Sequence, residues 1–169
     1  PADIILVTDV HGDHMDAAAI DKIKKASTIY VAPTALAGKF PGKTEIFKNG
    51  ETRTIDGLSI QAVAAYNLQR GPAAGQLFHD KGRGNAYVLT LGGKRLFFSG
   101  DTEWTESLVP AGRNADLYIM ECYQFDGVPR FHMSWTQISA QLDRIGARRV
   151  MLTHMAPAML DRRGEVKDP

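Results

Sequence analysis

A cluster of ionisable side chains directly after an apolar run constrains this chain more than any other feature. Residues 4–7 are Ile, Ile, Leu and Val, a run that is typical of a buried strand. Asp9, His11, Asp13 and His14 follow within a few residues. Open α/β sheets bind ligands at the carboxyl ends of their strands, and these residue types bind Zn, Fe or Mn. The pattern therefore predicts a metal site on an α/β fold, with a solvated polar turn as the simpler alternative.

Length and composition favour one globular domain. The 169 residues are 44% hydrophobic and 23% charged, which suits one sizeable core, and we expect a single domain over residues 1–169. A net charge of +1 gives no support for binding to nucleic acid or to an anionic membrane, and no apolar run is long enough for a transmembrane helix. The lone Cys122 excludes an intramolecular disulfide and is compatible with a reducing cytosol, so we expect a cytoplasmic protein.

Predicted strands and helices alternate along the chain. Helical spacing of apolar residues indicates helices over residues 15–26 and 134–145, the second with Ser134 and Gln137 in a capping-box pattern. Shorter helical turns are expected at 34–37 and after Pro157. Short apolar or β-rich runs, several of them bounded by glycine turns, predict the strands, at 28–32, 44–47, 52–55, 58–64, 85–91, 94–98, 117–120 and 148–152. Residues 67–84 form a long loop, which in a compact domain is usually functional or mobile.

Three further polar residues stand at predicted strand ends. Asn67, Asp101 and His154 each follow an apolar strand, as the first cluster does. If these strands lie side by side, their polar ends face one edge of the sheet. A metal ion needs such convergence, because its protein ligands bond at about 2.0–2.2 Å.

In combination, these motifs resemble those of the metallo-β-lactamase-fold hydrolases. The matching segments are Asp9-Val10-His11-Gly12-Asp13-His14, Gly100-Asp101-Thr102 and Leu152-Thr153-His154, in the family's order and over nearly the whole chain. The resemblance implies an α/β fold, the four-layer αββα sandwich. Members of the family usually have strands before the first motif, so we expect the N-terminal strands to be missing and one sheet to keep an open edge or face. A fragment or a trimmed domain would begin in this way, and further chain or a second copy in a homo-oligomer would cover the gap.

The resemblance implies two metal sites with different ligand sets. One set is intact and consists of Asp13, His14, Asp101 and His154. The other would consist of Asp9, His11 and Asn67, where the family has a histidine at the first motif position and another in mid-chain. A neutral amide is a poor ligand for zinc, so we expect this second site to bind more weakly or to be empty. An Asn67 that only hydrogen-bonds a water or a loop is the alternative. The expected cofactor is zinc, as one or two ions, with Mn or Fe as alternatives.

His132 is a candidate for catalysis. It stands in Phe131-His132-Met133-Ser134, at a place that resembles the RNase Z and phosphodiesterase-like branch of the family, in which the histidine assists the leaving group. Glu121 is a candidate to orient it. A histidine packed at the start of a helix is the alternative.

The long loop carries candidates for substrate binding. His79, Lys81 and Arg83 lie among glycines there and are of types that cradle an anionic group. A solvated basic loop is the alternative, and His79 is also a candidate to replace the ligand lost at Asn67.

Metal-dependent hydrolysis of an ester or phosphodiester bond in a small-molecule substrate is the function that follows. A metal-activated water would attack the bond, Asp101 would bind or bridge the metal, Asp13 would orient the nucleophile, and His132 would aid departure of the leaving group. One alternative is a one-metal enzyme that acts on a lactone, thioester or amide. The other is a degenerate, non-catalytic metal-binding domain, which the changes at Asp9 and Asn67 favour.

Overall fold

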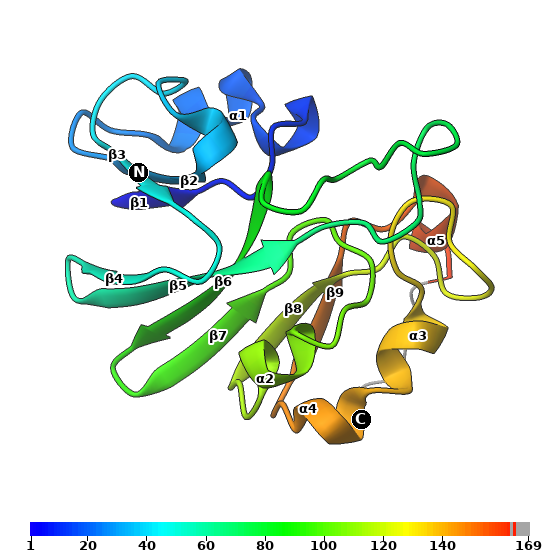
Figure 1. Ribbon diagram of the computed structural model, residues 1–169. Helices are drawn as coiled ribbons and strands as arrows, with labels where there is room; N and C mark the ends of the chain where they lie inside the picture. Colours follow the sequence, from blue (N-terminus) through cyan, green and yellow to red (C-terminus); the bar gives the residue numbers. More distant parts are fainter. Residues whose placement is uncertain (163, 165–169) are drawn as a thin grey trace.

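Two β-sheets form the centre of the computed structural model, which describes residues 1–162 and 164 (Figure 1). The smaller sheet has three parallel strands in the order β1-β2-β3, namely β1 (Ile4–Leu6), β2 (Ile29–Pro33) and β3 (Thr44–Phe47). The larger sheet has six strands in sequence order, namely β4 (Thr52–Ile55), β5 (Leu58–Ala65), β6 (Gly84–Leu91), β7 (Lys94–Phe98), β8 (Leu117–Glu121) and β9 (Val150–Thr153). Strands β4 to β7 pair antiparallel, whereas β8 pairs parallel with both β7 and β9.

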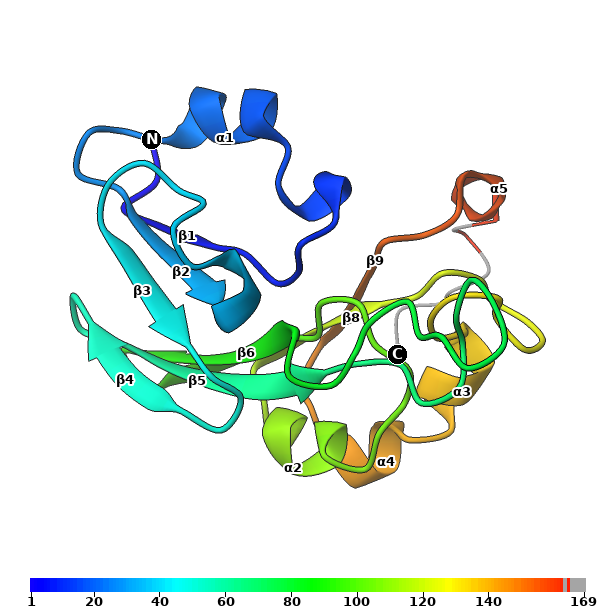
Figure 2. The same cartoon turned by 45° about the horizontal axis from the view of Figure 1, so that its top comes forward.

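Helices lie on the outer side of each sheet, so the layers follow the order α, β, β, α that the resemblance implies (Figure 2). The smaller sheet carries α1 (Ala17–Ile23) and the 3-10 helix η2 (Thr34–Leu36). The larger sheet carries α2 (Leu108–Gly112), α3 (Trp135–Ser139) and α4 (Leu142–Ile145). The 3-10 helix η1 (Gly12–His14) and α5 (Pro157–Leu160) follow the ends of β1 and β9. None of the helices in the described residues is long and apolar enough to cross a membrane.

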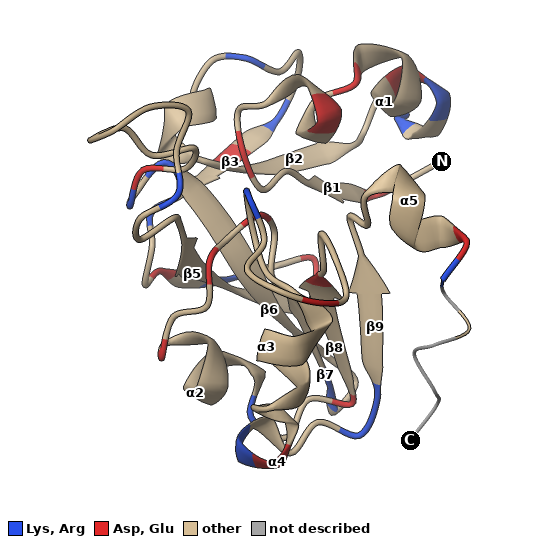
Figure 3. Ribbon diagram, turned by 90° about the vertical axis from the view of Figure 1, so that its right-hand side faces the viewer, with Lys and Arg blue, Asp and Glu red and all other residues tan. Residues whose placement is uncertain are grey.

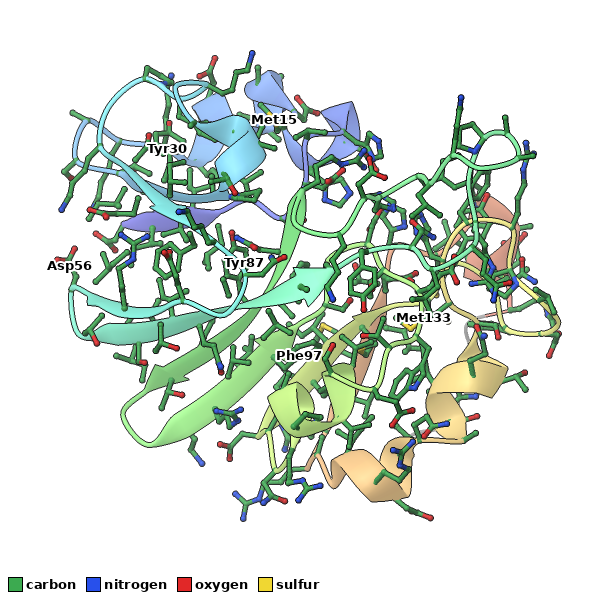
Figure 4. All side chains as sticks on the ribbon, in the orientation of Figure 1. Met15, Tyr30, Asp56, Tyr87, Phe97 and Met133 are labelled. Atoms are coloured by element: carbon green, nitrogen blue, oxygen red, sulfur yellow. The ribbon has the colours of Figure 1, made fainter. Side chains whose placement is uncertain are left out.

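The alternation of side chains along each strand produces three separate cores. In β2, Ile29 and Val31 belong to the core between the sheets, whereas Tyr30 and Ala32 pack on the side of α1, because successive side chains point to opposite faces of a strand. A third core joins the larger sheet to its helices, and in it Phe97 stacks on Tyr118 with ring centroids 4.6 Å apart. Figure 4 shows Tyr30 beside the smaller sheet and Phe97 beside the larger sheet.

The helices differ in detail from those predicted. The capping box at Ser134 is confirmed, but the helix expected over residues 134–145 is divided into α3 and α4. At the division the Gln141 N–H bonds to the Ile138 carbonyl, three residues back, so the chain tightens before the second helix begins. Helix α2 was not predicted, because Pro110 and Gly112 are poor helix formers. Burial of its apolar side chains against the larger sheet overrides that preference.

Strands β7 to β9 keep an open face. The core between the sheets draws its residues from β1 to β6 only. Beyond it, Met151 is 51% exposed, and a cleft of about 1220 Å³ is lined by residues of β7, β8 and β9. The open face expected from the sequence is therefore present. Acidic and basic segments are interspersed along the ribbon (Figure 3), in keeping with the net charge of +1.

Tyr87 connects the two sheets near the end of β1. Its hydroxyl donates to the Val7 carbonyl oxygen at 2.8 Å and accepts from the Asn85 amide at 3.3 Å. The same amide donates to the Phe47 carbonyl oxygen at 3.1 Å. Burial raises the pKa of the Tyr87 phenol well above its usual value, so the hydroxyl keeps its proton. These bonds fix Val7, which directly follows β1 and lies two residues before Asp9. Figure 4 shows Tyr87 between the two sheets.

Replacement of this hydroxyl is expected to loosen the contact between the sheets. Tyr87→Phe should lower the free energy of unfolding by about 1–3 kcal/mol, because the Val7 carbonyl and the Asn85 amide lose a buried partner. Urea denaturation measures the change. Tyr118→Phe is the matched control, since its ring is equally buried but its hydroxyl makes a longer bond of 3.4 Å. Equal losses in both variants would contradict a special role for Tyr87.

Candidate metal centre

Strand ends deliver most of the site's side chains to one edge of the molecule. Asp9 to His14 follow β1, Asp101 follows β7, and His154 follows β9. Gly100 makes the turn before Asp101 possible, because its φ is 58° and a Cβ there would lie 2.9 Å from Cβ of Thr8. His154 itself adopts a φ of 56°, which is unfavourable for a residue with a side chain. Such local strain is typical of functional sites and here turns the His154 ring toward Asp13.

The first group of converging ligand atoms comes from Asp13, His14, Asp101 and His154, and these atoms all lie within 4.8 Å of one another. His14 Nε2 is 3.2 Å from Asp101 Oδ2, and His154 Nε2 is 3.2 Å from Asp13 Oδ2. The ring of His14 is held from behind, because its Nδ1 lies 2.6 Å from the Thr8 hydroxyl. The structure therefore brings together the four residues that the sequence predicts for the intact site. They line a cavity of about 300 Å³ together with residues of β7, β8 and β9.

A second group consists of Asp9, His11 and His79. His11 Nδ1 is 3.0 Å from Asp9 Oδ2, and His79 Nε2 is 3.7 Å from the same oxygen. His79 Nε2 also lies 3.6 Å from Asp101 Oδ2. Asp101 therefore stands between the two groups, as a bridging carboxylate would.

The structure corrects the predicted role of Asn67. Its side-chain oxygen lies 2.6 Å from His79 Nδ1, and its amide nitrogen donates to Glu103 and to the Phe131 carbonyl oxygen. Asn67 thus stands behind His79 with its polar atoms engaged, and His79 is the side chain that converges with Asp9 and His11. The search for polar residues at strand ends did not point to His79, because His79 comes from the long loop and follows no strand.

The contacts of the long loop do not favour the predicted anion cradle. Arg83 Nε lies 3.1 Å from Asp9 Oδ1, and its guanidinium also bonds to the Phe78 carbonyl oxygen. The Lys81 ammonium lies over the ring of Tyr66, 5.2 Å from its centroid. His79 is 2% exposed and faces the carboxylates. The three residues therefore do not surround one anion, because Asp9 already neutralises Arg83.

His132 faces the site instead of merely packing at a helix start. Its Nε2 lies 3.4 Å from Asp101 Oδ2, and it forms a third converging group with His79 and Asp101. Glu121 accepts a hydrogen bond from the Met133 N–H at 2.8 Å, so it holds the backbone beside His132, not the imidazole. Figure 4 places Met133 at the edge of the larger sheet below the long loop.

Burial and the aspartates set the charges of the site. Burial alone would raise the pKa of Asp101, but the surrounding histidines outweigh it and lower this pKa to about 2. Burial likewise opposes charge on His14, yet Asp101 and Asp13 raise its pKa. Burial dominates for His79 and His132 and lowers both pKa values to about 4. These two imidazoles are therefore neutral at neutral pH, the form in which histidine binds metals.

The donor set fits a divalent metal ion. Nε2 of His14 and Nε2 of His79 are buried, yet within the described part of the chain neither has a partner in hydrogen-bond geometry. Buried polar atoms are rarely left in this state. Mixed imidazole and carboxylate donors are those of zinc, iron and manganese sites. A cation in the first group would satisfy the nitrogen of His14, and a cation in the second group would satisfy that of His79.

Arg83 is expected to weaken metal binding by Asp9, His11 and His79. Its positive charge lies at the Asp9 carboxylate and would repel a cation bound there. Arg83→Gln should therefore strengthen this weaker site by about tenfold or more, while the Asp13 set changes less. Calorimetric titration with zinc measures both affinities. Lys81→Gln is the matched control, since it removes an equal charge from the same loop, and an equal gain in both variants would contradict the argument.

Comparison with known proteins places the chain in a family. The family model described as a beta-lactamase superfamily domain matches residues 1–155. A metal-dependent hydrolase from Pyrococcus abyssi is 32% identical over 103 residues, which are 59% of this chain and 44% of that protein. A Caenorhabditis elegans homologue of the zinc phosphodiesterase ELAC protein 2 is 30% identical over 83 residues, 46% of this chain and 10% of that protein. The chain therefore spans less than half the length of these relatives.

A solved structure supports the same assignment over more of the chain. A protein described as a metal-dependent hydrolase from Parabacteroides distasonis superposes with a TM-score of 0.78 and 29% identity, over 97% of this chain and 70% of that one. The Bacillus subtilis protein YhfI, a metallo-β-lactamase-fold protein, superposes with a TM-score of 0.70 at 19% identity, over 92% of this chain and 65% of that one, and shows the shared fold. The motifs, the four layers and the family match agree, and this chain belongs to the beta-lactamase superfamily, with the metallo-β-lactamase fold.

Proposed function

We propose that the protein is a metal-dependent hydrolase that cleaves a phosphodiester bond in a small substrate. The observation that carries the proposal is the convergence of Asp13, His14, Asp101 and His154 on one point beside a cavity of about 300 Å³. Zinc is the favoured ion, because imidazole and carboxylate donors suit it and because the C. elegans relative is named a zinc phosphodiesterase. A cytoplasmic location and a homo-oligomer that covers the open face of β7 to β9 stay predictions.

The residues of the site take different parts in the proposed reaction. Asp13, His14, Asp101 and His154 would hold the tighter ion, and Asp9, His11 and His79 a weaker one. A divalent ion there would lower the pKa of a water molecule and polarise the oxygen of the scissile group. The buried Asp101 stays ionised because of its low pKa. The Asp13 side chain is 61% exposed and lines the cavity, so it can orient a water molecule and accept its proton.

A leaving-group role for His132 suits an anionic substrate better than a neutral ester. With a pKa lowered to about 4 by burial, the imidazole is neutral at neutral pH and has no extra proton to give. A phosphodiester anion beside it would stabilise the imidazolium and raise that pKa, whereas a neutral carboxylic ester would not. Help to a leaving group by His132 is therefore compatible with a phosphodiester and poorly compatible with a neutral ester.

Metal removal and return test the proposed function. The purified protein is expected to contain zinc, manganese or iron by elemental analysis, and to hydrolyse bis(p-nitrophenyl) phosphate faster than p-nitrophenyl acetate relative to the uncatalysed rates. A chelator should abolish turnover, and the returned ion should restore it. Asp101→Asn should lose metal and activity, whereas Asp116→Asn, which alters an aspartate paired with Lys94 and Arg148, should keep both. Absence of bound metal and of turnover would indicate a degenerate scaffold, and activity on the acetate alone would favour the ester alternative.

His132→Ala tests the role of the imidazole. If His132 protonates the leaving group, turnover should fall by about 10²–10⁴-fold for phosphodiesters with an alkoxide leaving group, and much less for those that release p-nitrophenolate. Steady-state rates on the two substrate types measure the difference, with metal content as the control. Loss of metal would make His132 a ligand of the ion. An equal loss on both substrates with metal retained would indicate a positioning role.

A further inference from the structure

His79 needs support that the strand-end residues do not need. It lies in the middle of a loop between β5 and β6, yet its side chain is 2% exposed and faces both Asp9 and Asp101. A neutral imidazole has two tautomers, and only the one with hydrogen on Nδ1 leaves Nε2 free to bind a metal ion. Some neighbouring group must therefore select that tautomer if His79 is a ligand.

Asn67 is placed to select it. Its Oδ1 lies 2.6 Å from His79 Nδ1, and a backbone bond from the Asn67 N–H to the His79 carbonyl oxygen, 2.8 Å long, fixes the two residues side by side. If the amide group were flipped, it would lose two hydrogen bonds, because its nitrogen donates to Glu103 Oε1 at 3.0 Å and to the Phe131 carbonyl oxygen at 2.8 Å. Both of those partners are acceptors, so the amide oxygen must face His79, and His79 Nδ1 must carry the hydrogen.

Glu103 is in turn held by the start of the long loop. Its Oε1 also accepts from the backbone N–H groups of Gln69 and Arg70, at 3.2 and 2.7 Å. The Arg70 guanidinium lies 3.6 Å from Glu103 Oε2 and donates to the His132 carbonyl oxygen at 2.6 Å. One buried network therefore supports the loop, the ring of His79 and the backbone at His132.

We propose that Asn67 and Glu103 are positioning residues, which hold His79 in the tautomer with hydrogen on Nδ1 and so present Nε2 to the metal site. The proposal rests on the function proposed above only in its metal-binding part. Groups that fix the outer nitrogen of a ligating histidine commonly change metal affinity by about 10- to 100-fold. Glu103 acts through Asn67, and Asn67 acts through His79, so neither residue touches the substrate.

The tautomer can be measured without metal and without activity. Long-range ¹H–¹⁵N correlation spectra of the metal-free protein at neutral pH should show His79 with hydrogen on Nδ1, its signals being identified through a His79→Gln variant. Asn67→Leu removes the acceptor and should shift His79 toward the other tautomer. Asn85→Leu is the matched control, because Asn85 is an equally buried asparagine that bonds to no histidine. It is expected to lower stability but to leave the tautomer unchanged.

Zinc affinity supplies the second measurement. Asn67→Leu should weaken the Asp9–His11–His79 site by about 10- to 100-fold. Glu103→Gln should weaken it less, since its amide oxygen still accepts from Asn67, and this variant keeps the shape of the buried side chain if Asn67→Leu does not fold. A parent protein with hydrogen on Nε2 of His79 would overturn the proposal. So would an Asn67→Leu variant that keeps both the parent tautomer and the parent affinity. A parent that shows the expected tautomer but binds no zinc would instead overturn the proposed function alone.

Discussion

The carboxylate of Asp101 is the point around which the site is organised. Nε2 atoms of His14, His79, His132 and His154 lie 3.2 to 3.6 Å from its Oδ2, and each arrives from a different segment of the chain. A buried carboxylate among imidazoles is stable only when cationic partners offset its desolvation. Among the histidines, Asp101 and Asp13 raise the pKa of His14 and so favour its charged form, and a metal ion held by this group would supply the remaining charge. The strained backbone at His154 and the glycine turn before Asp101 are local costs of this convergence.

The two ligand groups differ in how they are built, and this difference sets their expected strengths. Asp13, His14, Asp101 and His154 follow strands of both sheets, so their backbones are fixed by the fold. The second group depends on His79, whose position depends on a loop and on hydrogen bonds to side chains. It also includes Asp9, whose carboxylate already pairs with Arg83. Arg83 thus already provides part of the positive charge that a metal ion would bring to Asp9, so the group gains less from binding an ion.

The sequence was sufficient to predict the features that depend on regular strands and helices. Apolar runs with polar ends predict most strands and place ligand-type residues at their ends, whereas the four layers and the grouping of Asp13, His14, Asp101 and His154 are what the resemblance to the metallo-β-lactamase-fold hydrolases implies. Helix α2 could not be predicted, since tertiary burial overrides the preferences of Pro110 and Gly112. His79 could be named only as a candidate, because no periodic pattern fixes the path of an irregular loop. The hydrogen bond between Asn67 and Glu103 joins residues that are 36 positions apart. Only the three-dimensional structure reveals such a contact.

The loop of residues 67–83 therefore links metal binding to folding in a way that the strand ends do not. The ligands of the Asp13 set follow strands β1, β7 and β9, whereas the second group keeps its geometry only while the loop holds His79 in place. A segment held mainly by side-chain hydrogen bonds opens at a lower free energy than the strands around it. Ligands that need an ordered loop bind with an affinity reduced by the free energy of ordering that loop. Because Glu103 and Arg70 anchor both this loop and the backbone at His132, we expect order in the second ligand group and order at His132 to depend on the same contacts.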